Sequence, residues 1–114
     1  MRKLVVTNAF SINMIAPSAS DAQLGFFRIS LEDAQGMISR APWSSAIGHA
    51  ETAKVVSETL GTEIPMNRAT VTLRNDSEEE TELLIAQYVG PRLAEGATSL
   101  PEGARIDWFH VFNI

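Results

Sequence analysis

Short apolar runs separated by polar, Gly- or Pro-rich stretches predict most of the secondary structure of this chain. A fragment that alternates apolar and polar residues with period two, 68–75 (RATVTLRN), has the pattern of a half-buried strand. The acidic stretch 76–82 (DSEEETE) is typical of a solvated turn. We therefore predict an antiparallel hairpin that joins 68–75 to the apolar run at 83–89. Runs rich in β-branched and aromatic residues predict further strands at 3–10, 23–30 and 105–113.

Two segments have the spacing of amphipathic helices. The longer one, 49–61, places Ala53, Val56 and Leu60 on one face, and Gly61 is suited to end it. Ser30 and Asp33 have the spacing of a capping box at the start of a shorter helix, 31–39. The stretches 16–22, 40–48 and 90–104 are predicted to be irregular. Together these elements predict one compact α/β domain over residues 1–114. Its mixed, mostly antiparallel sheet has about five strands, with helices packed on it.

Composition limits the class of protein. With 114 residues, 45% hydrophobic and 20% charged, the chain has the balance of a single soluble globular domain. No apolar run is long enough to cross a bilayer, and the N-terminal run lacks the features of a signal peptide. The absence of cysteine excludes disulfides and thiolate metal sites. We therefore expect a protein of the cell interior with no membrane partner.

The formal net charge of −5 disfavours generic binding of duplex DNA. Such binding depends on the neutralisation of phosphates by Lys and Arg, so an acidic chain is poorly suited to it. A small basic pocket for a short nucleotide ligand remains compatible with this charge.

His49 begins the predicted central helix, directly after Gly48. One interpretation is a partly buried histidine that hydrogen-bonds the backbone at a helix start. The other is a catalytic acid, because helix N-terminal amides attract phosphate and an imidazole can supply a proton near neutral pH. In the second interpretation, Gly48 would let a ligand approach the backbone closely.

Two other groups of polar residues are open to a structural or a functional interpretation. Asn8, Ser11 and Asn13 follow a buried strand, where they either hydrogen-bond the turning backbone or line a ligand site. Arg92 and Glu95 either form a surface ion pair or act on a ligand, with Arg92 as a phosphate clamp and Glu95 orienting a base.

The remaining histidine, His110, lies among aromatic residues of the last predicted strand, and we expect a structural role for it. The two histidines are far apart in the sequence and form no His-x-x-x-His pair. We therefore expect no metal site.

Four motifs together resemble one small protein family: NAFSINM (8–14), SAIGHAET (45–52), LGTEIPMNRATVTL (60–73) and PRLAEG (91–96). It is the family of viral and bacterial anti-CRISPR ring nucleases, which degrade the cyclic tetra-adenylate messenger of type III CRISPR defence. The resemblance extends from about Lys3 to the last strand. It implies a homodimer that binds cyclic tetra-adenylate across its two-fold axis and needs neither a metal nor a cofactor.

The same resemblance implies roles for individual residues. His49 would be the general acid, Glu95 would position His49 or the reacting ribose, and Arg92 would hold a phosphate. Ser11 and Asn13 would lie around the ribose and phosphate, with Asn8 and Gly48 also at the ligand.

The implied reaction is attack of a ribose 2′-hydroxyl on the adjacent phosphate, which gives two linear di-adenylates with 2′,3′-cyclic phosphate ends. The protein would act in the cytoplasm, that of the host cell if it is encoded by a virus. The alternative function is a module that sequesters a cyclic nucleotide, or binds nucleic acid, without cutting it. Glycines at 90, 96 and 103 further suggest that segment 90–104 is a mobile lid that closes over the ligand.

Overall fold

Residues 2–76 and 78–114, which the computed structural model describes, form five strands, two α-helices and one 3₁₀ helix. In chain order these elements are β1 (Arg2–Thr7), η1 (Ile12–Met14), β2 (Leu24–Ile29), α1 (Leu31–Arg40), β3 (Trp43–Ser45), α2 (Ala50–Leu60), β4 (Glu80–Val89) and β5 (Arg105–Asn113).

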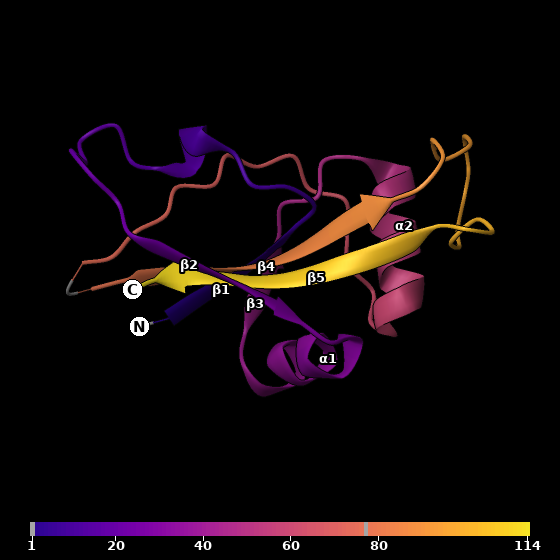
Figure 1. Cartoon of the computed structure of the whole chain (residues 1–114), viewed down its shortest axis with the longest axis horizontal. Helices are drawn as coiled ribbons and strands as arrows, with labels where there is room; N and C mark the ends of the chain where they lie inside the picture. Colours follow the sequence, from indigo (N-terminus) through magenta and orange to yellow (C-terminus); the bar gives the residue numbers. More distant parts are fainter. Residues whose placement is uncertain (1, 77) are drawn as a thin grey trace.

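The strands form a single sheet with the order β2-β5-β4-β1-β3 (Figure 1). β1 is parallel to both of its neighbours, β3 and β4, whereas β5 is antiparallel to both β2 and β4. The predicted mixed sheet of about five strands in a single α/β domain is therefore confirmed.

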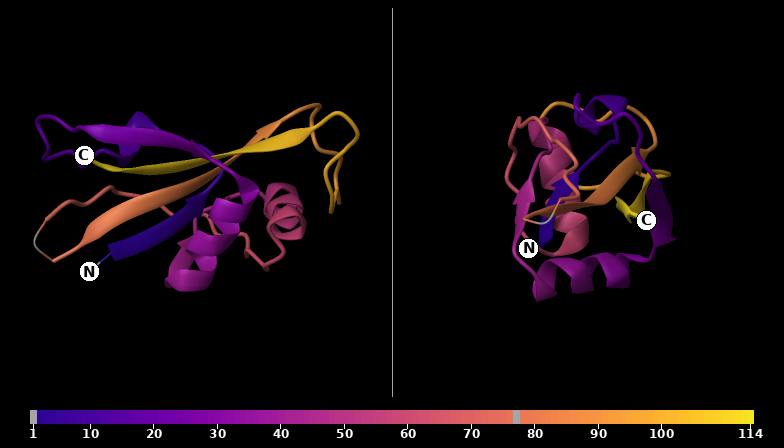
Figure 2. Two further views of the ribbon diagram at one scale, coloured as in Figure 1. Left: turned by 60° about the horizontal axis from the view of Figure 1, so that its bottom comes forward. Right: turned by 90° about the vertical axis from the view of Figure 1, so that its left-hand side faces the viewer.

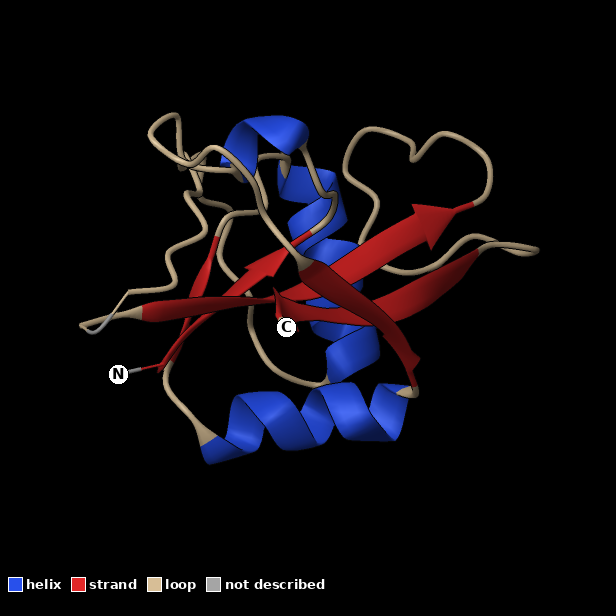
Figure 3. Cartoon of the chain, turned by 60° about the vertical axis from the view of Figure 1, so that its left-hand side comes forward, coloured by secondary structure: helices blue, strands red, loops and turns tan. Residues whose placement is uncertain are grey.

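Both helices cover the same face of the sheet (Figures 2 and 3). Ala53, Val56 and Leu60 of α2 are at most 3% exposed and pack in the main core, so the predicted buried face of this helix is confirmed. Burial of this apolar stripe, more than intrinsic helix propensity, stabilises a helix of this length. The two helices are also linked directly, since Gln35 of α1 donates a hydrogen bond to the carbonyl oxygen of Leu60 (3.1 Å).

Both helices have the ends that the sequence predicts. Ser30 Oγ accepts from the amide of Asp33 (3.1 Å), and the Asp33 carboxylate accepts from the amide of Ser30 (3.5 Å). Gly61 ends α2 with a φ of 78° and donates its amide to the carbonyl oxygen of Ser57 (2.9 Å). This left-handed conformation favours glycine, because it places no Cβ against the backbone.

The opposite face of the sheet is covered by long loops instead of helices. A second core lies under them, formed by Val5, Leu73, Leu83, Ile85 and Val111. The loop between β1 and β2 is held there by Ile15, which forms a parallel bridge with Leu73. This bridge fixes the position of η1, which matters for the site below.

The predicted strand at 68–75 is wrong. Only Leu73 and Asn75 form isolated bridges, and the rest of the segment is irregular. The predicted hairpin with 83–89 does not form because β5 pairs with all of those residues, which leaves only the bridge from Asn75 to Glu80. The turn around 76–82 is shorter than predicted, since β4 begins at Glu80, and position 77 lies outside the described residues.

A strand replaces part of the stretch predicted to be irregular at 40–48. Trp43–Ser45 form β3, which pairs in parallel with Leu4–Val6 of β1. Three residues give too short an apolar pattern to indicate a strand by themselves. The free edge of β1 organises this segment, so only the assembled sheet reveals it.

Candidate functional site

The loops that follow the three parallel strands leave the sheet at the same end. The polar residue Asn8 follows β1, residues 46–49 lead from β3 into α2, and the segment 90–104 follows β4. In Figure 1, α2 and the segment 90–104 lie together at one end of the molecule. Ligands of α/β proteins commonly bind at the carboxyl ends of parallel strands.

His49 is the N-cap residue of α2, with extended backbone angles (φ −125°, ψ 129°). Its side chain is exposed and makes no capping hydrogen bond. The interpretation of His49 as a partly buried, hydrogen-bonded histidine is therefore wrong. The imidazole is instead free to meet a ligand.

The first turn of α2 offers unpaired amide donors beside His49. The backbone N–H groups of Ala50 and Thr52 make no hydrogen bond with any residue of 2–76 or 78–114. Such groups, together with the helix dipole, favour an anion at a helix N-terminus.

An open cavity of about 790 Å³ brings His49 together with Arg92 and Glu95. Its other lining residues are Glu51, Thr52, Tyr88, Gly90 and Leu93. Arg92 and Glu95 are exposed, and within the described chain neither side chain forms an ion pair or hydrogen bond. The alternative of a surface ion pair between them is therefore wrong. An uncompensated guanidinium thus lies in the same cavity as the imidazole.

Glu51 is a cavity residue that sequence reasoning missed. Its carboxylate accepts a hydrogen bond from the amide of Gly96 (3.3 Å) and so connects α2 to the segment after β4. Hydrogen bonds from its own backbone amide and from that of Gly96 hold the pKa of Glu51 below its ordinary value of 4.5, with smaller contributions from Lys54 and His49. The signal available in the sequence was its place in the first helical turn, where a carboxylate can bond free amides.

This lowered pKa predicts a pH-dependent contact. A carboxyl group whose pKa is lower in the folded state stabilises it above the ordinary pKa and loses that contribution as pH falls through the lowered value. We therefore expect the Gly96 amide resonance to shift below pH 4.5 as Glu51 takes up a proton. In Glu51→Gln this titration should be absent, with Glu58→Gln, on the same helix, as the control. A Gly96 shift unchanged from pH 7 to pH 3 would contradict the contact.

The segment 90–104 contains no helix or strand, as predicted. Its first residue, Gly90, has a φ of 156° and lies so close to Ala104 that an added Cβ would be 2.6 Å from the Ala104 Cβ. The hydroxyl of Tyr88 donates to the carbonyl oxygen of Pro91. The two ends of the segment are therefore pinned together, while most of its residues are exposed.

Gly48 lies against a second arginine that the sequence did not single out. Arg68 donates Nε to the carbonyl oxygen of Gly48 (2.9 Å), and its Cγ would be 3.2 Å from a Cβ at Gly48. The space beside Gly48 therefore holds the Arg68 side chain, which differs from the predicted free approach to the backbone. A cavity of about 490 Å³ on this side is lined by Ala46, Gly48, His49, Arg68, Ala69 and Thr70. His49 thus has an arginine in each of two adjoining cavities.

Asn8, Ser11 and Asn13 do not line either cavity beside His49. Ser11 is the N-cap of η1, where its hydroxyl accepts from the Asn13 amide (3.2 Å). Figure 1 shows η1 well away from α2 along the long axis. Within one chain, Ser11 and Asn13 are therefore separate from the group formed by His49, Arg92 and Glu95.

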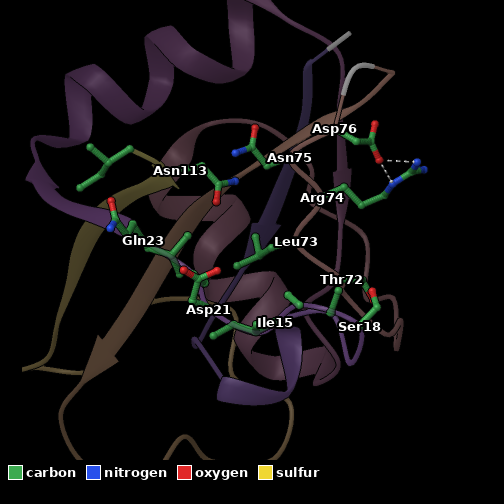
Figure 4. Close-up of a pocket in the computed structure, with 15 residues that line it drawn as sticks. Ile15, Ser18, Asp21, Gln23, Thr72, Leu73, Arg74, Asn75, Asp76 and Asn113 are labelled. Atoms are coloured by element: carbon green, nitrogen blue, oxygen red, sulfur yellow. Dashed lines mark hydrogen bonds and ion pairs between the residues drawn. The ribbon is translucent and has the colours of Figure 1, made fainter.

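Another cavity, of about 600 Å³, lies near the C-terminus between residues 15–24 and 72–76 (Figure 4). Its arginine, Arg74, is neutralised by ion pairs to Asp76 (2.7 Å) and Glu79 (3.0 Å). This cavity therefore lacks the uncompensated positive charge that an anionic ligand requires.

His110 lies on β5, away from these cavities, and its Nε2 is 2.6 Å from a carboxylate oxygen of Glu82. Across residues 2–76 and 78–114, no group of three or more His, Cys, Asp or Glu side chains is placed to hold a metal ion. In the same residues, no helix is both long and apolar enough to span a bilayer.

Comparison with known proteins identifies the family. The sequence signature of the STIV B116-like family matches residues 4–104, which is most of the chain. A solved structure with the same fold is B116 of Sulfolobus turreted icosahedral virus (STIV), with 27% sequence identity and a TM-score of 0.75. The match covers 97% of this chain and 99% of that one. No curated protein sequence matches. The chain belongs to the STIV B116-like family.

Proposed function

We propose that the protein is a metal-independent ring nuclease that cleaves cyclic tetra-adenylate into linear di-adenylates with 2′,3′-cyclic phosphate ends. The observation that carries the proposal is one cavity at the N-terminus of α2. It holds the exposed His49 together with Arg92 and Glu95, whose side chains are not bonded to any described residue. The products follow from the chemistry of RNA, in which the 2′-hydroxyl is a nucleophile already placed next to the phosphodiester.

The residues available suit this reaction without further groups. Alignment of the 2′-hydroxyl with the bond that breaks makes the attack effectively unimolecular. Arg92 and the free amides of α2 would stabilise the negative charge that develops on the phosphate. His49 would donate a proton to the departing 5′ oxygen, a role worth about 10²–10⁴-fold in rate. Solvent water would take the proton that the attacking 2′-hydroxyl releases. Glu95 would orient His49 or the reacting ribose, and Arg68 would hold a neighbouring phosphate.

The biological role that fits this reaction is antagonism of type III CRISPR defence. Removal of the messenger would switch off the enzymes that it activates. Membership of a family that includes a viral protein supports this role. The protein would then act in the host cytoplasm, where the messenger is made.

The test is incubation of the purified protein with cyclic tetra-adenylate in excess EDTA, followed by chromatography of the nucleotides. We expect complete turnover to di-adenylates in chelator, because none of the proposed steps uses a metal. Turnover that stops in EDTA and returns with one divalent ion would contradict the mechanism. A ring that stays intact but co-elutes with the protein would instead favour a sequestering module.

Closure of the segment 90–104 is a second expected consequence. Most residues of the segment are exposed, and the Glu51–Gly96 and Tyr88–Pro91 hydrogen bonds tie it to the rest of the protein. We expect its amides to exchange quickly in the free protein and to be protected when the ring is bound, as in other loops that fold over substrates. Hydrogen exchange with and without ligand measures this directly, ideally with a His49→Ala variant so that the ring survives. Equal protection in both states would mean a preformed site.

A further inference from the structure

The segment 68–72 has the sequence of a strand but no strand partner among the residues that the structure describes. Backbone hydrogen bonds hold the chain on either side of it. The Asn67 amide donates to the Ile47 carbonyl oxygen (2.8 Å), and the Leu73 amide donates to the Met14 carbonyl oxygen (2.7 Å). Between these anchors, the amide and carbonyl groups of 68–71 make no hydrogen bond with any described residue. An exposed run of unpaired backbone groups is a template for pairing with another chain.

The segment and the stretches of sequence next to it are almost free of charge. Residues 64–73 carry a single charge, Arg68, and the adjoining residues 8–20 carry none, in a chain that is 20% charged. The two stretches touch through the Ile15–Leu73 bridge. Ile12 and Met66, which lie on them, are 74% and 51% exposed. Depletion of charge with exposed apolar side chains is the composition of an interface core.

We infer that 68–72 pairs in antiparallel fashion with the same segment of a second copy, about a two-fold axis at Thr70. The segment can pair with its own copy, because this register sets Thr70 opposite the Thr70 of the second copy and Arg68 opposite Thr72. Thr–Thr pairs across strands are favourable, and no like charges face each other. A chain with a net charge of −5 repels a second copy, whereas residues 8–20 and 64–73 contain no acidic residue.

The pairing would also complete the candidate site. Arg68 bonds the carbonyl of Gly48, next to His49, so an axis at Thr70 brings both histidines toward one side of the dimer. The two Arg68 residues would stand four residues apart along the paired strands, about 13 Å. Pairing through the outer edge of β2 would instead separate the histidines, since β2 and β3 are opposite edges of the sheet. Only this consequence rests on the proposed function; the interface itself does not.

Cysteine cross-linking of the full chain tests the interface, because the natural sequence has no cysteine. Ala69→Cys, Thr70→Cys and Val71→Cys are made singly and oxidised without ligand. Residues directly opposite in an antiparallel pair lie about 4.5–5.5 Å apart at Cα, within the range of a disulfide. We expect Thr70→Cys to give a covalent dimer rapidly. Phe26→Cys, at an exposed position on β2, should not.

A charge variant gives an independent readout. Thr70→Glu would place two carboxylates face to face, so we expect light scattering to fall from the mass of a dimer to that of a monomer. Thr62→Glu, also at an exposed threonine, should stay dimeric, and melting curves confirm that both variants fold.

The interface would be overturned by a monomeric parent or by a dimeric Thr70→Glu. Cross-linking at Phe26 but at none of the three central positions would also overturn it. If the parent is dimeric as inferred but leaves the ring uncut, the proposed function fails and the interface stands. If the parent protein cuts the ring while Thr70→Glu stays dimeric, the interface fails and the proposed function stands.

Discussion

His49→Ala should lose at least about 100-fold of its single-turnover rate on cyclic tetra-adenylate, because the general acid is then missing from a site that is otherwise intact. The fold should survive the change. The His49 side chain makes no capping hydrogen bond and is exposed, so its removal takes no stabilising contact from α2. Binding of the ring should change little, since Arg92, Arg68 and the helix amides remain.

The matched control for this variant is His110→Gln, which changes the other histidine at a position away from the cavities. It should cleave the ring at the parent rate once melting curves show that it is folded. A His49→Ala rate within about threefold of the parent would exclude the general-acid role. Loss of rate together with an equal loss of affinity would mean that His49 mainly binds the phosphate.

Arg92→Ala should weaken binding of the ring by roughly 10- to 100-fold. A hydrogen bond to a charged group contributes about 1.5–3 kcal/mol, and each 1.4 kcal/mol is tenfold in affinity. Arg92 lines the cavity with His49 and forms no ion pair among the described residues, so a phosphate need not displace a bound acid from it. Calorimetry with a ring that cannot be cut, or in the His49→Ala background, measures the effect.

Arg40→Ala is the control, because it removes the same charge from the end of α1, away from the cavities that contain His49. It should bind the ring nearly as well as the parent, apart from a small long-range effect that salt screens. Arg92→Lys should recover part of the affinity, since it restores the charge but not the planar fork of donors. If His49→Ala weakens binding more than Arg92→Ala does, the two residues must exchange their assigned roles.

Local features of the sequence were enough to predict both helices and their ends. The capping box of Ser30 and Asp33, the apolar face of α2 and its stop at Gly61 all depend on residues within a few positions of each other. The four apolar runs that became β1, β2, β4 and β5 are long enough to show their pattern without reference to the rest of the chain. Local physics therefore determined the two α-helices and these four strands.

The grouping of the site residues was predictable only in part. His49 was predicted at a helix start, and His49, Arg92 and Glu95 do line one cavity. Glu51 and Arg68 were missed because their importance comes from contacts with Gly96 and Gly48, which are distant in sequence. Ser11 and Asn13 lie elsewhere because the bridge from Ile15 to Leu73 draws η1 away from α2.

Competition among strands for edges was decided by the tertiary structure. RATVTLRN has a strand pattern as clear as any in the chain, yet it forms only isolated bridges, because β5 pairs with its predicted partner, 83–89. Trp43–Ser45, with almost no pattern, form β3 because the second edge of β1 is free. The sequence by itself determined the two α-helices and the four longer strands. Which extended segments pair depends on hydrogen-bonding edges that exist only once the sheet is assembled, and so does the convergence of His49, Arg92 and Glu95 at its end.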